Sequence, residues 1–268
     1  MTDPVLVPFD FDGPGVRAVV STRLGGVSAG AYAGLNLGDH VGDDPAAVRH
    51  NRDLLARALG VPRLTIADQQ HGATVAVVTA ADAGRGHSGA ADAAAAFPAT
   101  DALVTDVPGV ALTVLVADCT PVLLWDPVRR VAGAVHCGRP GTIAGVLPAT
   151  VAVLAATYGS DPADLVAGVG PGICRTSYEV TDTEAAAMEE AFEGLGFTEP
   201  TRPGHHLLDV PAAVAHQLAA AGVATVHTLG VDTRTDTARF YSHRAVRPCG
   251  RFAAVIVIGE APTTPRRG

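Results

Sequence analysis

The most regular feature of the chain is a series of short segments in which apolar and β-branched residues predominate. Several of these segments alternate apolar and polar positions, which predicts strands with one buried face. Four of them follow one another between positions 102 and 136, and this order favours antiparallel pairing through short turns. The segments expected to form strands are VRAVVSTR, LTIAD, ATVAVVT, ALVTD, VALTVLVAD, PVLLWD, VAGAVH, DLVAGVG, TVHTLGVDT and RFAAVIVIG.

Longer segments with helical spacing lie between these strands. Residues 44–60 are the clearest, because Asp44 is a good N-cap and Gly60 is suited to end a helix. Residues 142–159 are expected to form a second helix, which Pro148 should kink or split.

Two further helices carry their own N-terminal signals. Residues 181–196 open with a capping box of Thr181 and Glu184, and residues 209–222 begin at an aspartate. Runs of adjacent strands mixed with helices, rather than a regular strand–helix alternation, indicate the α+β class with mixed, largely antiparallel sheets.

Composition narrows the class of protein. The formal net charge of −8 disfavours a general nucleic-acid binder, which needs a basic face. The longest strongly apolar stretch, VALTVLVA, is too short to span a membrane, and the acidic N-terminus does not resemble a signal peptide. We therefore expect a cytoplasmic protein with free thiols. Since no repeat or break in composition divides the chain, residues 1–268 are expected to form a single domain with a disordered tail at about 260–268.

Cys119 and His136 are the first residues whose proximity follows from the sequence. The strands expected at 121–126 and 131–136 are joined by the short turn PVRR, so they should pair antiparallel. Position 126 then faces position 131, and position 121 faces position 136. Cys119, two residues before the first strand, is therefore expected within a residue or two of His136 in space.

A neighbouring cysteine and histidine can be a nucleophile and its base, two metal ligands, or two unrelated core residues. His71 favours the metal, because it lies in a tight polar turn, QQHG, where a core histidine would be unusual. One cysteine and two histidines leave the fourth tetrahedral position open, which is the pattern of a catalytic zinc. His71, Cys119 and His136 are thus the predicted metal ligands and catalytic residues. The other two interpretations stay open, since the spacing of the three is not a local metal motif.

Candidate anion-binding features accompany this trio. His136 is followed by a glycine-rich turn, HCGRPG, that leads into a helix, and helix N-termini bind phosphate through exposed amides. Arg23, Arg52 and Arg244 could clamp a phosphate or a ribose-bearing substrate, although each taken alone is better explained as a solvated or structural arginine. The segment GVGPG lacks the third glycine of a dinucleotide loop, so no nucleotide cofactor is expected.

Ordered segments along nearly the whole chain resemble the YfiH/YlmD family, long described as multicopper polyphenol oxidases or laccase-domain proteins. The resemblance implies a layered α-β-β-α fold, and it implies a metal site at the same His71, Cys119 and His136. The segments that carry it are STRLGGVS, GLNLGDHVGDDPAAVRHNRDLL, QQHG, ADCTPVLL, AVHCG, GPGI, YEV, LDV, FYSHRA and CGRFAAVIVI.

The resemblance also implies an activity. Members are regarded as purine nucleoside phosphorylases, which convert adenosine, inosine, guanosine and S-methyl-5′-thioadenosine with phosphate to the base and a ribose 1-phosphate, and which deaminate adenosine. The implied cofactor is zinc, with copper able to bind in vitro. The implied partners are purine nucleosides and phosphate, with no nucleic acid or membrane. The substrate- or phosphate-binding residues expected from the matched segments are Arg23, Asn36, Arg52, Gln70, Asp118, Gly138, Arg139 and Arg244.

The chain departs from the family pattern beside the ligand histidine. Family members carry H-A-G-W-R-G, whereas here Arg139 stands at the tryptophan position and Pro140 at the arginine position. Arg139 could restore the lost positive charge, while Pro140 stiffens the turn and removes an amide. Three alternatives stay open: a thiol hydrolase or deamidase that uses Cys119 and His136, a copper-dependent polyphenol oxidase, and a non-catalytic binding protein.

Overall fold

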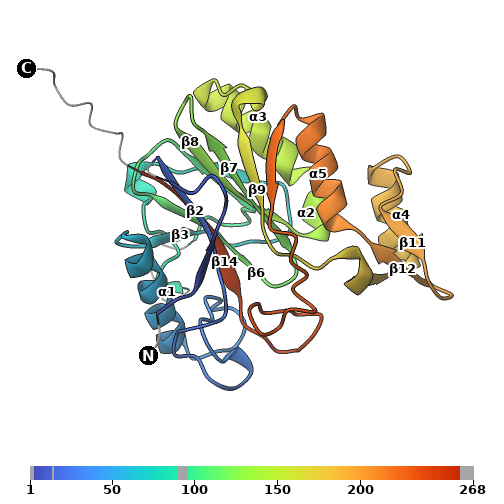
Figure 1. Ribbon diagram of the computed structural model, residues 1–268, viewed down its shortest axis with the longest axis horizontal. Helices are drawn as coiled ribbons and strands as arrows, with labels where there is room; N and C mark the ends of the chain where they lie inside the picture. The colour runs from blue at the N-terminus through green and yellow to red at the C-terminus, as the bar shows by residue number, and fades with distance from the viewer. Residues whose placement is uncertain (1–2, 14, 90–95, 260–268) are drawn as a thin grey trace, which may run out of the picture.

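Two large β-sheets stacked face to face lie at the centre of the molecule (Figure 1). The computed structural model describes residues 3–13, 15–89 and 96–259. The first sheet runs in the order β1 (Leu6–Pro8), β2 (Val16–Ser21), β14 (Phe252–Ile258), β6 (Ala111–Val116) and β3 (Leu64–Ile66). The second runs in the order β13 (Thr225–Thr228), β9 (Val166–Val169), β7 (Thr120–Asp126), β8 (Val131–Cys137), β5 (Ala102–Thr105) and β4 (Val75–Val77).

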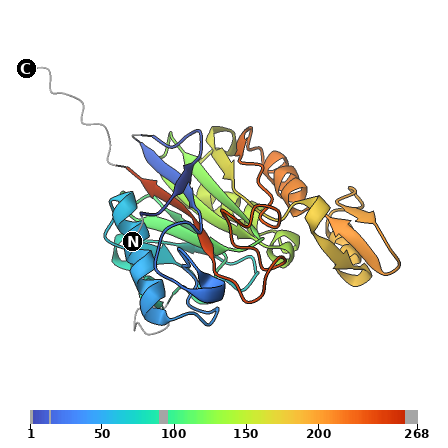
Figure 2. The ribbon, with the colours of Figure 1, turned by 60° about the horizontal axis from the view of Figure 1, so that its bottom comes forward.

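A small third sheet projects from one side of the molecule, together with one helix (Figure 2). Pairing in all three sheets is mostly antiparallel, and the parallel pairs are β3 with β6, β4 with β5, and β9 with β13. The elements of the projection are β10 (Glu179–Thr181), β12 (His205–Leu208), β11 (Thr198–Pro200) and α4 (Asp182–Ala191).

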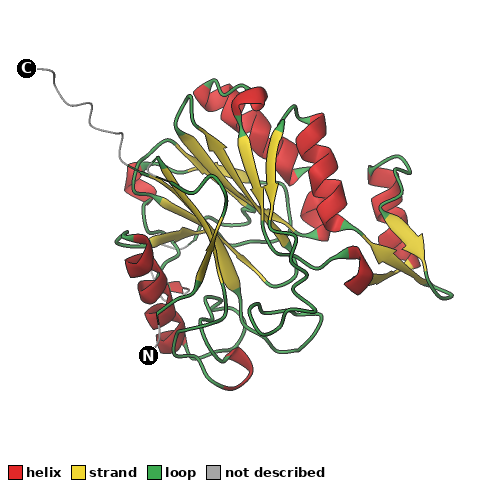
Figure 3. Ribbon diagram, in the orientation of Figure 1, coloured by secondary structure: helices red, strands yellow, loops and turns green. Residues whose placement is uncertain are grey.

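Helices cover the outer faces of both large sheets (Figure 3). Buried apolar side chains form one cluster between the sheets, a second between the second sheet and its helices, and a third between the first sheet and its helix. The α+β class and the layered α-β-β-α arrangement with mixed, largely antiparallel sheets are therefore confirmed. The first sheet is covered by α1 (Pro45–Leu59), and the second by α2 (Arg139–Ile143), α3 (Val146–Tyr158) and α5 (Val210–Ala220).

Layering explains why the central strands are apolar at every position. In β14, Ala254 and Ile256 point between the two sheets, whereas Ala253 and Val255 point towards α1. Alternate side chains of a strand lie on opposite faces, so a strand covered on both sides needs apolar residues throughout. The uninterrupted apolar runs in the sequence are thus the strands of the double-layered core.

Helix ends follow the local signals more closely than helix lengths do. In α1, Asp44 caps the helix by accepting from Ala46, and Gly60 ends it in the left-handed conformation, as predicted. The helix predicted for 142–159 begins earlier, at Arg139, and is split at Gly145, which has φ 79°. Pro148 does not cause this break, since it lies in the first turn of α3, where an amide would have no helical partner.

The capping box that opens α4 is present, but the helix is shorter than predicted. Thr181 accepts from the amide of Glu184, and the Glu184 carboxylate accepts from the amide of Thr181. The helix ends at Ala191 rather than at residue 196, because Glu193 and Gly194 both take positive φ angles. The strands on either side of α4 were not predicted.

Other short elements complete the described part of the chain. The expected tail at about 260–268 lies outside the described residues, and the single domain spanning 1–268 stays a prediction. Within the described ranges, every helix is too short or too polar to cross a membrane. Single turns of 3₁₀ helix lie at Gly30–Tyr32, Ala80–Asp82, Pro162–Asp164 and Arg175–Ser177.

Candidate active site

The hairpin of β7 and β8 has the register predicted from the sequence. Asp126 pairs with Val131, and Pro121 pairs with His136. Cys119 immediately precedes β7, so its side chain and that of His136 lie at the same end of the hairpin. The predicted proximity of Cys119 and His136 is confirmed.

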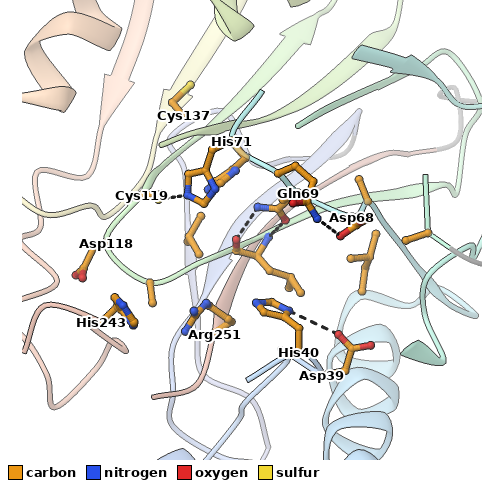
Figure 4. A pocket seen from close by; sticks show the side chains of 18 of the residues that line it. Asp39, His40, Asp68, Gln69, His71, Asp118, Cys119, Cys137, His243 and Arg251 are labelled. Atoms are coloured by element: carbon orange, nitrogen blue, oxygen red, sulfur yellow. Dashed lines mark hydrogen bonds and ion pairs between the residues drawn. The ribbon is translucent and has the colours of Figure 1, made fainter. Parts of the chain in front are cut away.

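His71 completes a cluster with these two residues (Figure 4). It lies between β3 and β4 with a φ of 61°, and its Nε2 is 3.6 Å from Sγ of Cys119. Its ring centroid is 4.7 Å from that of His136. One nitrogen from each histidine and the Cys119 sulfur all lie within 4.8 Å of one another. Three elements far apart in the sequence thus bring together the predicted ligand set.

Asp101 holds this cluster in place, and the sequence analysis did not predict it. Its buried carboxylate accepts from Nδ1 of His136 at 2.8 Å and from the amides of His71 and Gly72 at 2.9 and 2.7 Å. Because Nδ1 of His136 donates to a carboxylate, Nε2 of His136 is left to face the cluster. Carboxylates that orient a ligand histidine in this way are common in zinc sites.

Electrostatics favour the thiolate form of Cys119. Burial raises the pKa of its thiol, but the imidazoles of His136 and His71 outweigh that effect and lower it below the usual range. Burial alone would lower the pKa of His136, yet the charge of Cys119 and the hydrogen bond to Asp101 raise it. The thiolate is the form needed both for metal binding and for nucleophilic attack, so both interpretations of Cys119 are chemically sound.

Gly138 provides the space that the cluster occupies. Its φ of −77° is ordinary, so backbone conformation does not require a glycine there. A Cβ at this position would overlap Cδ2 of His71 and lie 3.1 Å from Sγ of Cys119. Two imidazoles and one thiolate form a donor set that zinc takes with three protein ligands. The residues present therefore fit a zinc ion, and the close approach of the backbone at Gly138 is part of that fit.

The cluster opens onto a cavity of about 940 Å³. Asp68 lies on one wall, and His243 and Arg251 lie on another (Figure 4). Gln70 belongs to the wall of Asp68, since its side chain donates to the Asp68 carboxylate at 2.9 Å. The volume is within the usual range for a site that takes a small organic molecule. The geometry therefore joins a candidate metal site to a ligand cavity.

Comparison with known proteins identifies the family. Residues 17–259 match the family described as multi-copper polyphenol oxidoreductase laccase. The chain belongs to this laccase family. It is 46% identical over 236 residues to a protein from Streptomyces coelicolor named purine nucleoside phosphorylase, which covers 87% of this chain and 92% of that one. It is 40% identical over 245 residues to a Mycobacterium tuberculosis protein of the same name, with coverage of 90% and 91%.

Solved structures within the laccase family have the same fold. YlmD from Geobacillus stearothermophilus superimposes with a TM-score of 0.87 and 35% identity, over 92% of this chain and 93% of that chain. YfiH from Bacillus licheniformis superimposes with a TM-score of 0.84 and 30% identity, over 93% and 98%. The resemblance to the YfiH/YlmD family is therefore confirmed.

Several of the residues predicted to bind substrate do reach the cavity of this laccase-family chain. Gln70, Asp118, Arg139 and Arg244 line it, and Gly138 lies against the metal cluster. Asp118 has an unusual φ of 85°. These five remain candidates for contact with a ligand.

Arg52 lines the same cavity but has a structural role. The side chain is 1% exposed, and it forms an ion pair of 3.2 Å with Asp39. Its remaining donors bond to the backbone carbonyl groups of Leu37, Gly86 and His87. Its guanidinium thus holds two loops together, and substrate binding by Arg52 stays a prediction.

Arg23 and Asn36 are not among the residues that line the cavity, and their contact with substrate stays a prediction. Arg23 donates to two backbone carbonyl groups and lies over the ring of Tyr241. Asn36 is fully buried and donates to Asp43 while its own oxygen accepts from two backbone amides. Both side chains fix the loops around α1.

The unusual turn after His136 opens a short helix, and the anion site expected there stays a prediction. The helix that it opens, α2, has five residues, and Pro140 lies in its first turn without an amide to donate. Arg139 is bonded to Glu184 at 2.8 Å, which ties this turn to α4. The departure from the family pattern therefore joins α2 to the projecting sheet.

Proposed function

We propose that this protein is a zinc-dependent purine nucleoside phosphorylase. Its substrates would be adenosine, inosine, guanosine and S-methyl-5′-thioadenosine with phosphate, and adenosine deamination would be a second activity in the cytoplasm. One observation carries the proposal: a His–Cys–His cluster opens onto a nucleoside-sized cavity in a chain 39–46% identical to relatives named purine nucleoside phosphorylase.

The residues of the site suit such a reaction. In phosphorolysis a phosphate oxygen forms a bond to C1′ of the ribose, while the glycosidic bond breaks and its electron pair leaves with the purine. A zinc ion held by His71, Cys119 and His136 would supply a Lewis acid with one open coordination position. Asp101 would keep the His136 ring in a fixed orientation throughout. The arginines of the cavity would favour the phosphate anion.

The proposal is tested by coupling metal analysis to base release. Purified protein with about one zinc per chain should release adenine from adenosine only when phosphate is present, and chromatography should also detect inosine. Cys119→Ala should lose both zinc and base release. Cys174→Ala is the matched control, because this half-exposed cysteine is not among the residues that line the cavity. Wild-type, zinc-loaded protein that releases no base and forms no inosine would refute the proposal.

A thiol hydrolase or deamidase is the second candidate, because the structure favours the thiolate of Cys119 beside His136. Removal of zinc by a chelator distinguishes the thiol enzyme from the zinc-dependent phosphorylase. Turnover that survives complete removal of zinc but stops when Cys119 is alkylated supports the thiol enzyme. A copper oxidase with several copper sites is not proposed. One group of three or more histidine, cysteine or carboxylate side chains is placed to hold a metal within residues 3–13, 15–89 and 96–259.

A further inference from the structure

One wall of the cavity is built by the segment that leads into β14. His243, Arg244, Arg247 and Arg251 lie on this segment, and all four line the cavity. His243 and Arg251 are seen on the same side of the cavity as Asp118 (Figure 4). We name the three arginines of this segment the cationic wall.

The three arginines of the cationic wall have no carboxylate partner in the described part of the chain. Arg247 donates to the backbone carbonyl of His243, and Arg251 donates to backbone carbonyls within its own segment. Arg244 donates to the backbone carbonyl of Glu179 and lies over the ring of Tyr178. These contacts orient the guanidinium groups without neutralising them.

This arrangement is unusual for the molecule. The chain has a net charge of −8, and the other arginines that line the cavity, Arg52 and Arg139, are each paired with a carboxylate. Burial, and after it the charges of Arg247 and Arg251, lower the pKa of His243, which favours a neutral imidazole beside these arginines. Three guanidinium groups that outnumber the one carboxylate beside them, Asp118, form a site for an anion at the cavity surface.

Asp118 fixes the cationic wall beside the metal cluster. Its carboxylate accepts from the hydroxyl of Thr233 and from the backbone amide of Arg244, both at 2.7 Å. Asp118 directly precedes Cys119, so one residue connects the arginine segment to a candidate zinc ligand. Both carboxylate oxygens are engaged in holding the backbone. The opposite wall carries the carboxylate of Asp68, which accepts from Gln70 and would repel an anion.

We infer that Arg244, Arg247 and Arg251 bind the inorganic phosphate that attacks the nucleoside, and that the nucleoside lies between this wall and the wall of Asp68 and Gln70. The assignment rests on the proposed function and extends it, because it gives phosphate and nucleoside separate walls of one cavity. Phosphate would then approach the ribose from the side of Asp118.

Direct binding measurements test the cationic wall without relying on turnover. Titration calorimetry with inorganic phosphate should show that Arg247→Gln weakens binding by about 10-fold or more, the loss of one charge-assisted hydrogen bond to an anion. Arg247→Lys should recover part of the affinity, since it keeps the charge but loses the planar fork. Arg57→Gln is the matched control, because Arg57 is exposed on α1 and is not among the cavity residues.

Kinetics of the same variants separate this inference from the proposed function. The KM for phosphate should rise in Arg247→Gln while the KM for adenosine stays within about 2-fold, because the two ligands occupy different walls. If Arg247→Gln and Arg244→Gln both bind phosphate as wild type does, the cationic wall is wrong even where phosphorolysis is present. If the variants lose phosphate binding but the wild type releases no base, the assignment of the phosphate site is supported and the proposed phosphorylase activity is refuted.

Adenosine 5′-monophosphate tests whether the cationic wall binds free phosphate or the phosphate group of a nucleotide. A site for free phosphate should bind inorganic phosphate alone, and its affinity should fall as sodium chloride is added. Binding of adenosine 5′-monophosphate with no binding of inorganic phosphate would overturn the assignment, because the wall would then serve a nucleotide.

Discussion

At Gly138 the His–Cys–His cluster leaves too little room for a side chain. Gly138→Ala is expected to displace the His71 ring and to lower zinc content sharply, because the new Cβ overlaps Cδ2 of that ring. The fold should survive, since Gly138 has an ordinary φ of −77° and the His71 side chain is free to rotate away. Metal analysis after dialysis and thermal unfolding measure the two effects separately.

The control for this substitution is Gly13→Ala, where an added Cβ meets nothing within 4 Å. It should keep both zinc and thermal stability. Zinc content in Gly138→Ala equal to that of Gly13→Ala would contradict the close approach that the structure shows.

Asp101 is expected to matter for metal affinity as well as stability. In Asp101→Asn an amide group replaces one oxygen. It would face either Nδ1 of His136 and the amide of His71, or the amides of Gln70 and Gly72. Each buried donor that loses its acceptor costs about 1–3 kcal/mol of folding free energy. Zinc affinity should fall roughly 10-fold to 100-fold, as the ring of His136 loses its orientation. Urea unfolding and zinc competition titrations measure the two quantities.

Asp126→Asn is the matched control, because Asp126 is also fully buried but lies at the far end of the β7–β8 hairpin. Its Oδ1 accepts from two backbone amides, and Oδ2 has no partner, so an amide is accommodated there. Equal zinc affinity in the two variants would show that Asp101 does not orient His136.

At the residue scale, the sequence predicts the three residues of the His–Cys–His cluster better than it predicts the residues that hold them. His71, Cys119 and His136 are found because their residue types name a chemistry and a short turn fixes one distance. The Asp101 carboxylate contributes through four hydrogen bonds to residues about 30 positions away. No local pattern marks such an aspartate, because its partners meet only after β5 has paired with β8.

Among the elements, α4 is linked to the site by a residue that also caps it. Glu184 accepts from Thr181 through one oxygen and from Arg139 through the other. Thr181→Ala and Glu184→Ala should each lose about 1 kcal/mol of stability, because either one removes the capping box. Only Glu184→Ala should also raise the KM for the nucleoside, since it releases Arg139 from its place on the cavity wall.

The two variants are compared by urea unfolding and by initial rates at varied nucleoside concentration. A KM that rises equally in both would assign the effect to the helix end rather than to Arg139. An unchanged KM in both would show that Arg139 does not depend on Glu184 for its position.

The β7–β8 hairpin could be predicted from local sequence, whereas the projecting sheet could not. The β7–β8 register is set by a short turn between two apolar runs, and local sequence therefore determines it. The projecting sheet has strands of three or four residues, with half-exposed and exposed positions, and so it has no apolar period to detect. Its pairing depends on β10 and β12 meeting across the whole length of α4. The structural contacts of Arg23, Asn36 and Arg52 could not be predicted for a similar reason, since only packing shows which acceptors their donors reach.

In the whole molecule, the candidate metal site lies where three separate segments of the chain come together. His71 comes from the loop between β3 and β4, Cys119 from the start of β7, and His136 from the end of β8. The apolar clusters on both sides of each large sheet are built from residues other than these histidines. Zinc would therefore join strands that the core already holds, in contrast to a small domain that folds only around its metal.

Removal of zinc is accordingly expected to leave the protein folded. A site filled at about 1,000 times its Kd stabilises the native state by roughly 4 kcal/mol, which for a chain of this size raises Tm by about 10 °C. Chelated wild type should thus keep its far-ultraviolet circular dichroism and a cooperative transition, with Tm lower by that amount. Cys119→Ala should melt at one temperature with or without chelator. Loss of the cooperative transition on chelation would show instead that the two-sheet core depends on the metal.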